Sequence, residues 1–333
     1  MKILAIDDDA IIRELLYEIL TAIGYTSVSF ASSGHEALEI LEAEEEPFDC
    51  LLLDIQMPEM DGITLVSLLR SSVKYARTPI LMITAMSDRK YVDNAFAAGA
   101  TDYINKPFNI GELHARLKLI EDLVIERKQI QDRSTVRWAD SNDFPMAAAD
   151  TTERLHIEDV DSVIDYLSLE NYMLQMSRAS LFGNCVFGVA IKDSQHLFQG
   201  ISKYEFNFAI TDVAEAISDC LKPYRFFVAH AGGGDFACIR DVGRSFDRHE
   251  FEMSVAERLR DMELYYCEGR PMVIHLAASE PIQLDWRSSR SSVNALLESV
   301  GNAERYANSP AITPVQAIPP PAKAIQLMLG ATK

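Results

Sequence analysis

The sequence contains few basic residues and no long apolar run. Lys and Arg total 31 against 50 Asp and Glu, which gives a formal net charge of −19. A surface of that sign repels the phosphates of nucleic acids and anionic membranes, so we expect neither as a partner. No apolar run approaches the ~18 residues of a membrane span, and the segment from Met1 to Asp7 has no signal-peptide pattern. We therefore expect no insertion into a membrane.

Cysteine is also scarce in this chain. There are five, an odd number, and none forms a C-x-x-C pair. The five are Cys50, Cys185, Cys220, Cys238 and Cys267, and most of them lie in apolar runs. Buried, reduced thiols in a cytoplasmic protein are the expected state. With 333 residues, the chain is long enough for two domains.

In the first 120 residues, short apolar segments alternate with segments of helical periodicity. The expected strands are residues 3–6, 26–30, 51–53, 79–84 and 102–105. Ser33 with Glu36, and Asn109 with Glu112, have the spacing of helix caps. The alternation predicts an α/β domain with a flavodoxin-like, doubly wound, five-stranded parallel sheet.

Polar residues follow four of these strands. Asp7 and Asp8 come after the first strand, Asp54 after the third, Thr84 ends the fourth and Lys106 follows the fifth. Because the carboxyl ends of parallel strands meet at one edge, we expect these side chains to converge. Three carboxylates repel one another, and Mg²⁺ would relieve that conflict. Lys and Thr would then supply donors to an anion, so the sequence predicts a phosphoryl-transfer site with Asp54 as the nucleophile.

The motifs at these strand ends occur in a characteristic order. They are Ile6-Asp7-Asp8-Asp9, Leu53-Asp54-Ile55-Gln56-Met57-Pro58, Asp61-Gly62, Ile83-Thr84-Ala85 and Asp102-Tyr103-Ile104-Asn105-Lys106-Pro107-Phe108. In these motifs residues 1–122 resemble the receiver domain of bacterial response regulators. The resemblance implies that Asp54 accepts a phosphoryl group from the phosphohistidine of a sensor histidine kinase or phosphotransfer protein.

The resemblance also implies roles for the neighbouring residues. Its Mg²⁺ ligands would be Asp8, Asp54 and the main-chain carbonyl of Gln56, with Asp7 acting through water. Thr84 and Lys106 would hold the phosphoryl oxygens. Tyr103 would be an aromatic switch that turns inward when Thr84 moves. The face made by the fourth helix, fifth strand and fifth helix would then change, and we expect it to be the output surface, which includes Lys90, Tyr91, Tyr103 and Phe108. A homodimer formed on phosphorylation is expected through it.

Residues 123–154 are expected to be a helical connector and linker. The last helix of the first domain should run from Gly111 to about Trp138. Its apolar residues recur at steps of three and four: Leu113, Leu117, Ile120 and Val124, with Arg127 at the next position of the pattern. This spacing is compatible with a short coiled coil or with an amphipathic helix that packs on its own domain. Residues 139–152 have the composition of a linker, and residues 307–333 form a Pro-rich tail.

Residues 155–306 show a different pattern, with fewer strands and a central hairpin, which predicts an α+β domain with a mixed sheet. The hairpin sequence is Gly232-Gly233-Gly234-Asp235-Phe236. In this sequence and in element order the segment resembles the GGDEF domain of diguanylate cyclases. It departs from that family at Gly234, where the family has a metal-binding acid, and at Lys192-Asp193, where it has a metal-ligating Asp. Pro223 and Phe226 replace its product-inhibition site.

We therefore expect the second domain to be catalytically silent and to act by protein–protein interaction. A divergent, phosphorylation-activated diguanylate cyclase that makes cyclic di-GMP from GTP is the alternative. For Gly232–Gly234, a simple turn that needs positive φ is also possible. His230 and His275 lie in apolar strands and are expected to be ordinary sheet residues.

Overall fold

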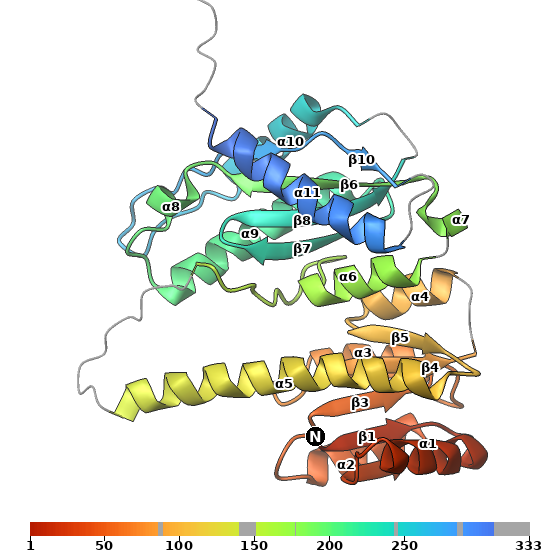
Figure 1. Cartoon of the computed structure of the whole chain (residues 1–333). Coiled ribbons are helices and arrows are strands. Elements are labelled where there is room, and N and C mark those ends of the chain that lie inside the picture. Colours follow the sequence, from red (N-terminus) through yellow and green to blue (C-terminus); the bar gives the residue numbers. More distant parts are fainter. Residues whose placement is uncertain (86–88, 140–150, 177, 243–245, 285–288, 310–333) are drawn as a thin grey trace, which may run out of the picture.

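A computed structural model describes residues 1–85, 89–139, 151–176, 178–242, 246–284 and 289–309. Two sheets, each with its own helices, lie one above the other in Figure 1. We call them the first and second domains. Both sheets lie inside the domain limits predicted from the sequence, residues 1–122 and 155–306. The limits themselves stay predictions. Among the described residues, every helix is too short or too polar to cross a bilayer.

The first domain is built on a parallel sheet of five strands in the order β2-β1-β3-β4-β5. The strands are β1 (Ile3–Ile6), β2 (Val28–Ala31), β3 (Cys50–Leu53), β4 (Ile80–Thr84) and β5 (Asp102–Asn105). The helices are α1 (Ala10–Ala22), α2 (Gly34–Ala43), α3 (Gly62–Arg70), α4 (Arg89–Ala97) and α5 (Ile110–Ala139). Apolar residues of α1 and α5 fill the core on one face, and those of α2, α3 and α4 fill the core on the other. The predicted doubly wound sheet is confirmed.

Helix α5 bears on the two alternatives left open for the connector. The apolar positions Leu113, Leu117, Ile120 and Val124 are buried in the core beneath the sheet. Side chains that fill their own domain's core are not available for a coiled-coil seam, so the structure favours the amphipathic helix. Most of the predicted linker (140–150) and of the predicted tail (310–333) lies outside the described residues.

The second domain contains a sheet in the order β10-β6-β8-β7, with β9 paired to β6. Its strands are β6 (Asn184–Ile191), β7 (Phe226–Gly232), β8 (Asp235–Asp241), β9 (Leu276–Ala278) and β10 (Ile282–Gln283). Its helices are α6 (Tyr166–Gln175), α7 (Arg178–Leu181), α8 (Ser194–Leu197), α9 (Lys203–Leu221), α10 (Arg248–Asp261) and α11 (Ser289–Ala307). Helices α9 and α10 pack on one face, and α6 and α11 pack on the other.

The pairing between these strands is antiparallel throughout, so the predicted mixed sheet is wrong. The chain follows a β-α-β-β-α-β path, in which α9 connects two strands that run in the same direction, β6 and β7. Strand β8 lies between them and pairs with both, which removes the parallel contact. A parallel contact exists as an isolated bridge between Val163 and Val228.

Helix α11 crosses strand β6 unusually closely at Gly188. A Cβ atom on Gly188 would lie 2.5 Å from the carbonyl oxygen of Ser299 and 2.6 Å from the Cα atom of Val300. Both distances are far shorter than normal van der Waals contact, so this crossing requires glycine.

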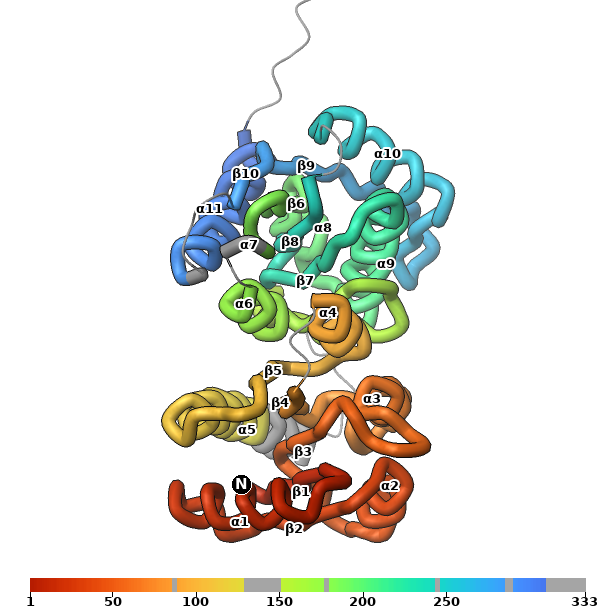
Figure 2. Tube along the Cα trace, turned by 90° about the vertical axis from the view of Figure 1, so that its right-hand side faces the viewer, coloured from red at the N-terminus to blue at the C-terminus, as the bar shows by residue number. Residues whose placement is uncertain are grey.

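The two domains share one hydrophobic core. A single cluster of buried side chains includes Phe96 and Tyr103 of the first domain together with Leu169, Tyr172 and Met173 of α6. Helix α6 lies beside α4 and above β5 (Figure 2). The face expected to be an open output surface is therefore partly covered by this chain itself. Tyr103 is buried, whereas Lys90 and Tyr91 remain exposed.

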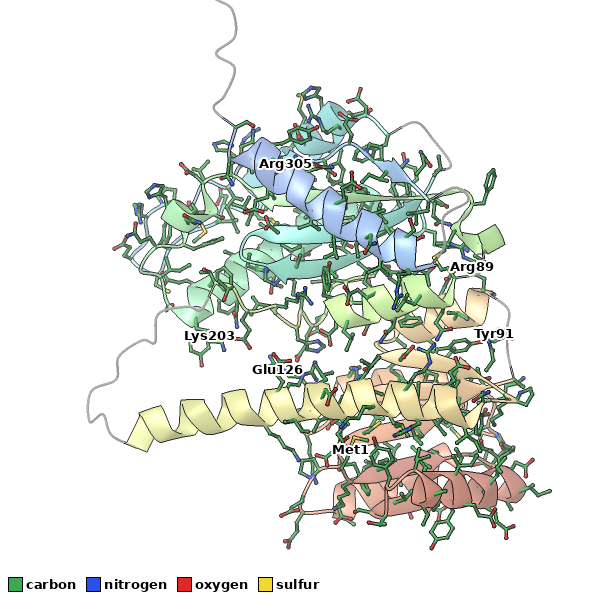
Figure 3. All side chains as sticks on the ribbon, viewed as in Figure 1. Met1, Arg89, Tyr91, Glu126, Lys203 and Arg305 are labelled. Atoms are coloured by element: carbon green, nitrogen blue, oxygen red, sulfur yellow. The ribbon has the colours of Figure 1, made fainter. Side chains whose placement is uncertain are left out.

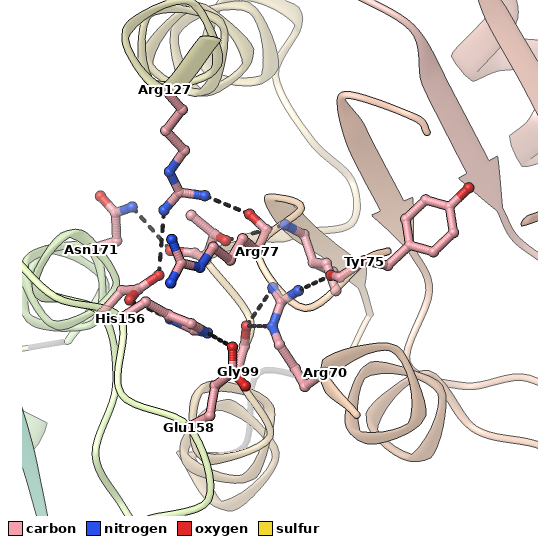
Figure 4. A network of polar contacts seen from close by, with 11 residues as sticks. Arg70, Tyr75, Arg77, Gly99, Arg127, His156, Glu158 and Asn171 are labelled. Carbon is pink, nitrogen blue, oxygen red and sulfur yellow. Dashed lines mark hydrogen bonds and ion pairs between the residues drawn. The ribbon is translucent and has the colours of Figure 1, made fainter. Parts of the chain in front are cut away.

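A polar network also joins the domains (Figure 4). Arg127 on α5 donates a hydrogen bond to the carbonyl oxygen of Arg77 at 2.5 Å and lies 3.6 Å from a carboxylate oxygen of Asp165. The other oxygen of Asp165 lies 2.7 Å from Nδ1 of His156. Beside this pair, Arg70 donates to the carbonyl oxygen of Gly99 at 2.8 and 3.0 Å. The entry segment of the second domain is thus attached to the first domain by charged side chains.

Candidate functional site

Strand register brings the predicted site residues together at one sheet edge. Ile6 pairs with Leu53, so Asp7 and Asp54 leave adjacent strands at the same level. Thr84 pairs with Asn105, and Lys106 follows directly. The sheet alone therefore places two carboxylates, a hydroxyl and an ammonium at the carboxyl edge, as predicted from the sequence.

The Lys106 ammonium bridges the two carboxylates. Its Nζ atom donates to Oδ2 of Asp7 at 2.6 Å and to Oδ1 of Asp54 at 2.8 Å. The remaining oxygens accept main-chain hydrogen bonds, Asp54 Oδ2 from Gln56 at 2.7 Å and Asp7 Oδ1 from Asp9 at 3.0 Å. Asp54 is held in one orientation by a charge and a backbone amide. Asp8 is exposed, and the structure gives it no contact with Lys106.

Burial shapes the electrostatics of this group. It raises the pKa of the Asp54 carboxyl; Lys106 opposes the rise and Asp7 adds to it. Desolvation alone would lower the pKa of Lys106, but its hydrogen bonds to Asp54 and Asp7 outweigh that effect and raise it. Lys106 therefore stays protonated, and its charge favours the ionised, nucleophilic form of Asp54.

The loop after Asp54 is closed by a glycine. The Gly62 amide donates to the carbonyl oxygen of Ile55 at 2.9 Å, and a Cβ atom on Gly62 would lie 2.1 Å from the Asp54 carbonyl oxygen. Asp61 begins α3 by accepting a hydrogen bond from the amide of Thr64 at 2.7 Å. The Asp61-Gly62 pair therefore sets the path of the backbone around Asp54.

The remaining predicted residues, Thr84 and Tyr103, are both buried. The hydroxyl of Tyr103 donates a hydrogen bond to Oδ1 of Asn105 on the same strand. Asn105 was not predicted as a site residue from the sequence. Its place two residues from Tyr103 on one strand puts both side chains on the same face, and that spacing is the signal that could have identified it. Phe108 is half-buried.

The donor set fits Mg²⁺ better than a metal held entirely by side chains. Among the described residues, no three His, Cys, Asp or Glu side chains gather closely enough to hold a metal ion. Mg²⁺ commonly takes one or two carboxylates and completes its octahedron with waters and phosphate oxygens. Asp54 supplies one such carboxylate, and Asp7 lies beside it on the same Lys106 ammonium, where it could act through a water.

The hairpin of the second domain contains no comparable group. Gly232 and Gly233 have φ values of 112° and 63°, which a turn at these positions requires. A Cβ atom on Gly234 would lie 2.9 Å from the Cβ atoms of both Ile191 and Ser194, so the space for an acid is filled. Burial, with a contribution from Glu304, raises the pKa of Asp235 to about 7.

His230 and His275 of the second domain were expected to be ordinary sheet residues. The buried His230 accepts a hydrogen bond from the amide of Leu155 at 2.9 Å, and its other ring nitrogen lies 3.0 Å from the carbonyl oxygen of Gly233. It therefore fastens the entry segment to the hairpin. His275 directly precedes β9 and so is not a strand residue as predicted; its carbonyl oxygen accepts a hydrogen bond from the amide of Lys192.

Comparisons with known proteins agree with the geometry of the first domain. The family model described as response regulator receiver domain matches residues 3–118. Chemotaxis protein CheY1 of Helicobacter pylori is 37% identical over 120 residues, which are 36% of this chain and 96% of that protein. The match to the structure of Vibrio cholerae chemotaxis protein CheY4 covers 36% of this chain and 97% of the CheY4 chain, with 35% identity and a TM-score of 0.34.

A longer relative matches over a stretch of about the same length. Transcriptional regulatory protein CrdR of Helicobacter pylori is 41% identical over 117 residues, which are 35% of this chain. The match spans 53% of CrdR, about half its length. None of these matches shows a GGDEF domain in residues 155–306. The likeness lies in the receiver segment, and through that segment the chain belongs to the response regulators.

Proposed function

We propose that Asp54 is the phosphoacceptor of this response regulator and that the second domain is a non-catalytic output module. The observation that carries the proposal is the bridge from Lys106 to Asp54 and Asp7, which keeps a buried carboxylate oriented and beside a permanent positive charge. The phosphodonor would be the phosphohistidine of a sensor histidine kinase or of a phosphotransfer protein.

The chemistry is a displacement at phosphorus. An oxygen of Asp54 forms a bond to phosphorus, the bond from phosphorus to the histidine nitrogen breaks, and the departing imidazole keeps the electron pair and takes a proton from solvent. Lys106 and Thr84 hold the phosphoryl oxygens. Mg²⁺ would be held by Asp8, Asp54 and the Gln56 carbonyl, with Asp7 through water, and would neutralise charge on the transferred group.

Metal dependence tests this proposal. Wild-type protein incubated with acetyl phosphate and Mg²⁺ should gain one phosphate per chain, and EDTA should slow the gain by about 100-fold or more, because a metal supplies several kcal/mol to such a transfer. Native mass spectrometry measures the phosphate and, in the same spectrum, any homodimer formed. Equal labelling with and without metal would count against the site as assigned.

Helix α1 supplies a surface for the donor protein. It begins just after the acidic cluster, and Ile11 and Leu15 on it are 73% and 42% exposed. Apolar side chains one helical turn apart beside the reacting group suit contact with a helical partner. We propose that the protein carrying the phosphohistidine docks on this stripe.

Ile11→Glu should slow transfer from a phosphorylated histidine kinase by about tenfold, the usual scale for losing an apolar anchor. Labelling by acetyl phosphate should be unchanged, because a small donor needs no docking surface. Val73→Glu is the control, since Val73 is fully exposed on another part of the domain. An equal loss with both donors would mean that Ile11 affects the site itself.

The second domain is proposed to act through protein contacts. The filled position at Gly234 supports this assignment, because an acid could not replace glycine there without moving Ile191 or Ser194. No observation on the described residues favours the cyclase alternative.

A further inference from the structure

Helix α9 of the second domain has an exposed aromatic face. Its inner side chains, including Phe206, Ile210 and Val213, fill the core under the sheet. On the outer side, Tyr204 and Phe208 are one helical turn apart and are 74% and 67% exposed. Large exposed side chains at this spacing are typical of a helix face that binds another apolar segment.

The same face of α9 is acidic further along the helix. Asp212 and Glu215 follow Phe208 at helical spacing, so they lie on the side of the two rings. Asp219 pairs with a basic side chain at 2.7 Å, whereas within the described ranges neither Asp212 nor Glu215 forms an ion pair. We call Tyr204, Phe208, Asp212 and Glu215 the α9 stripe.

Contacts outside the helix fix both ends of α9. At its start, Ser202 and Glu205 form a capping box, and Glu205 also accepts a hydrogen bond from the Cys267 amide at 2.8 Å. Near its end, Asp219 pairs with Arg258 of α10. The α9 stripe therefore lies on a fixed helix, which lowers the cost of ordering when a ligand binds.

The C-terminal segment, residues 310–333, has the opposite charge. It contains Lys323 and Lys333 and no acidic residue, in a chain whose net charge is −19. Its charge therefore favours contact with an acidic face of the same molecule.

An apolar run in this segment has the pattern of a short binding helix. Ile325, Met328 and Leu329 have the i, i+3, i+4 spacing of side chains that enter a partner from one helix face. Pro321 precedes the run and Gly330 follows it, and these residue types commonly begin and end a helix. The helix is a prediction from the sequence.

The spacing of charge and apolar surface agrees between the two segments. In a helix, Lys323 would lie about 7.5 Å along the axis from Met328, at 1.5 Å per residue. On α9, Asp212 lies about 6 Å along the axis from Phe208 by the same rise. An apolar run placed on the two rings would therefore bring Lys323 beside the acids.

The C-terminal segment can also reach α9. Helix α11 ends, and α9 begins, at the end of the second-domain sheet where β7 turns into β8 (Figure 1). Arg305 near the end of α11 and Lys203 at the start of α9 are labelled in Figure 3. Residues 310–322 could span roughly 40 Å as a Pro-rich spacer, about the diameter of a domain of this size.

We propose that the α9 stripe is the binding site for residues 322–330 of the same chain. The apolar run lies on the two aromatic rings, and Lys323 lies beside the two acids. The bound segment thereby covers this face of the second domain against other ligands. This inference goes beyond the function proposed for Asp54 and does not depend on it.

Tryptic cleavage after Lys323 in the full chain tests the contact. Mass spectrometry follows the release of residues 324–333, and a synthetic peptide of residues 310–333 gives the rate for the unbound segment. Wild type should be cleaved roughly tenfold more slowly than the peptide, because a tethered ligand has an effective concentration in the millimolar range and is mostly bound.

Tyr204→Ala should speed cleavage of the full chain roughly fivefold, because it removes one aromatic anchor. Glu215→Gln should speed it about twofold, the scale of an exposed ion pair. Tyr17→Ala is the matched control, since Tyr17 is 55% exposed on α1 of the first domain. The control should be cleaved at the wild-type rate.

The outcomes distinguish the occupants of the stripe. A wild-type rate equal to that of the peptide would overturn the proposal, and so would equal rates for Tyr204→Ala, Glu215→Gln and Tyr17→Ala. If dilution of the wild-type protein speeds cleavage, the segment binds a second copy, and the contact within one chain is wrong. All rates are measured without a phosphodonor, so a failure of the function proposed for Asp54 leaves this test unaffected.

Discussion

Asp54→Asn should take up no phosphate from acetyl phosphate and Mg²⁺. The amide has the shape of the carboxylate and can still accept the hydrogen bond that the Gln56 amide now gives to Oδ2. It has no anionic oxygen to attack phosphorus, and it removes one of the two charges that hold Lys106. Mass spectrometry of the intact chain measures the result directly.

Asp49→Asn is a matched control for this variant. Asp49 immediately precedes β3, whereas Asp54 follows it, and it too pairs with a lysine, Lys128, at 2.6 Å. It also accepts a hydrogen bond from the amide of Lys2 at 2.7 Å. The control should gain one phosphate, as wild type does. Labelling of Asp54→Asn at the wild-type level would place the phosphoacceptor elsewhere.

Gly188→Ala should destabilise the second domain by about 3 kcal/mol, the upper part of the range for overpacking a core. The new methyl group would meet the backbone of α11 at Ser299 and Val300, and a helix backbone cannot turn aside as the end of a flexible side chain can. Urea unfolding followed by circular dichroism measures the change in the free energy of unfolding.

Gly301→Ala provides the comparison on the same helix. A Cβ atom there meets nothing within 4 Å, so the expected effect comes from the higher helix propensity of alanine. This variant should be more stable than wild type by about 0.5–1 kcal/mol. If the two alanine variants unfold at the same urea concentration, the close crossing of α11 over β6 is not a feature of the folded protein.

The receiver could be predicted from its sequence because its signals are local. The strand ends at Asp7, Asp54 and Lys106 converge in any parallel sheet of that strand order, and the register of β1, β3 and β5 then brings their side chains together. The contact of Lys106 with both acids follows from that convergence.

The second domain was harder to predict, because strand order depends on contacts far apart in the sequence. The hairpin of β7 and β8 was evident, but nothing in the segment shows that β8 lies between β6 and β7, which is what makes the pairing antiparallel. The burial of Asp93 was equally hidden. It occupies a polar position on a surface helix, and only the arrival of Tyr172 and Arg225 removes it from solvent.

Because α6 packs against α4 and β5, any other protein that binds this face must compete with the second domain. The second domain belongs to the same chain as the receiver, so it meets this face at an effective concentration on the order of millimolar. A separate protein present at micromolar levels must bind the face roughly a thousandfold more tightly to displace it. Covalent connection thus gives the second domain priority over any other occupant of that face.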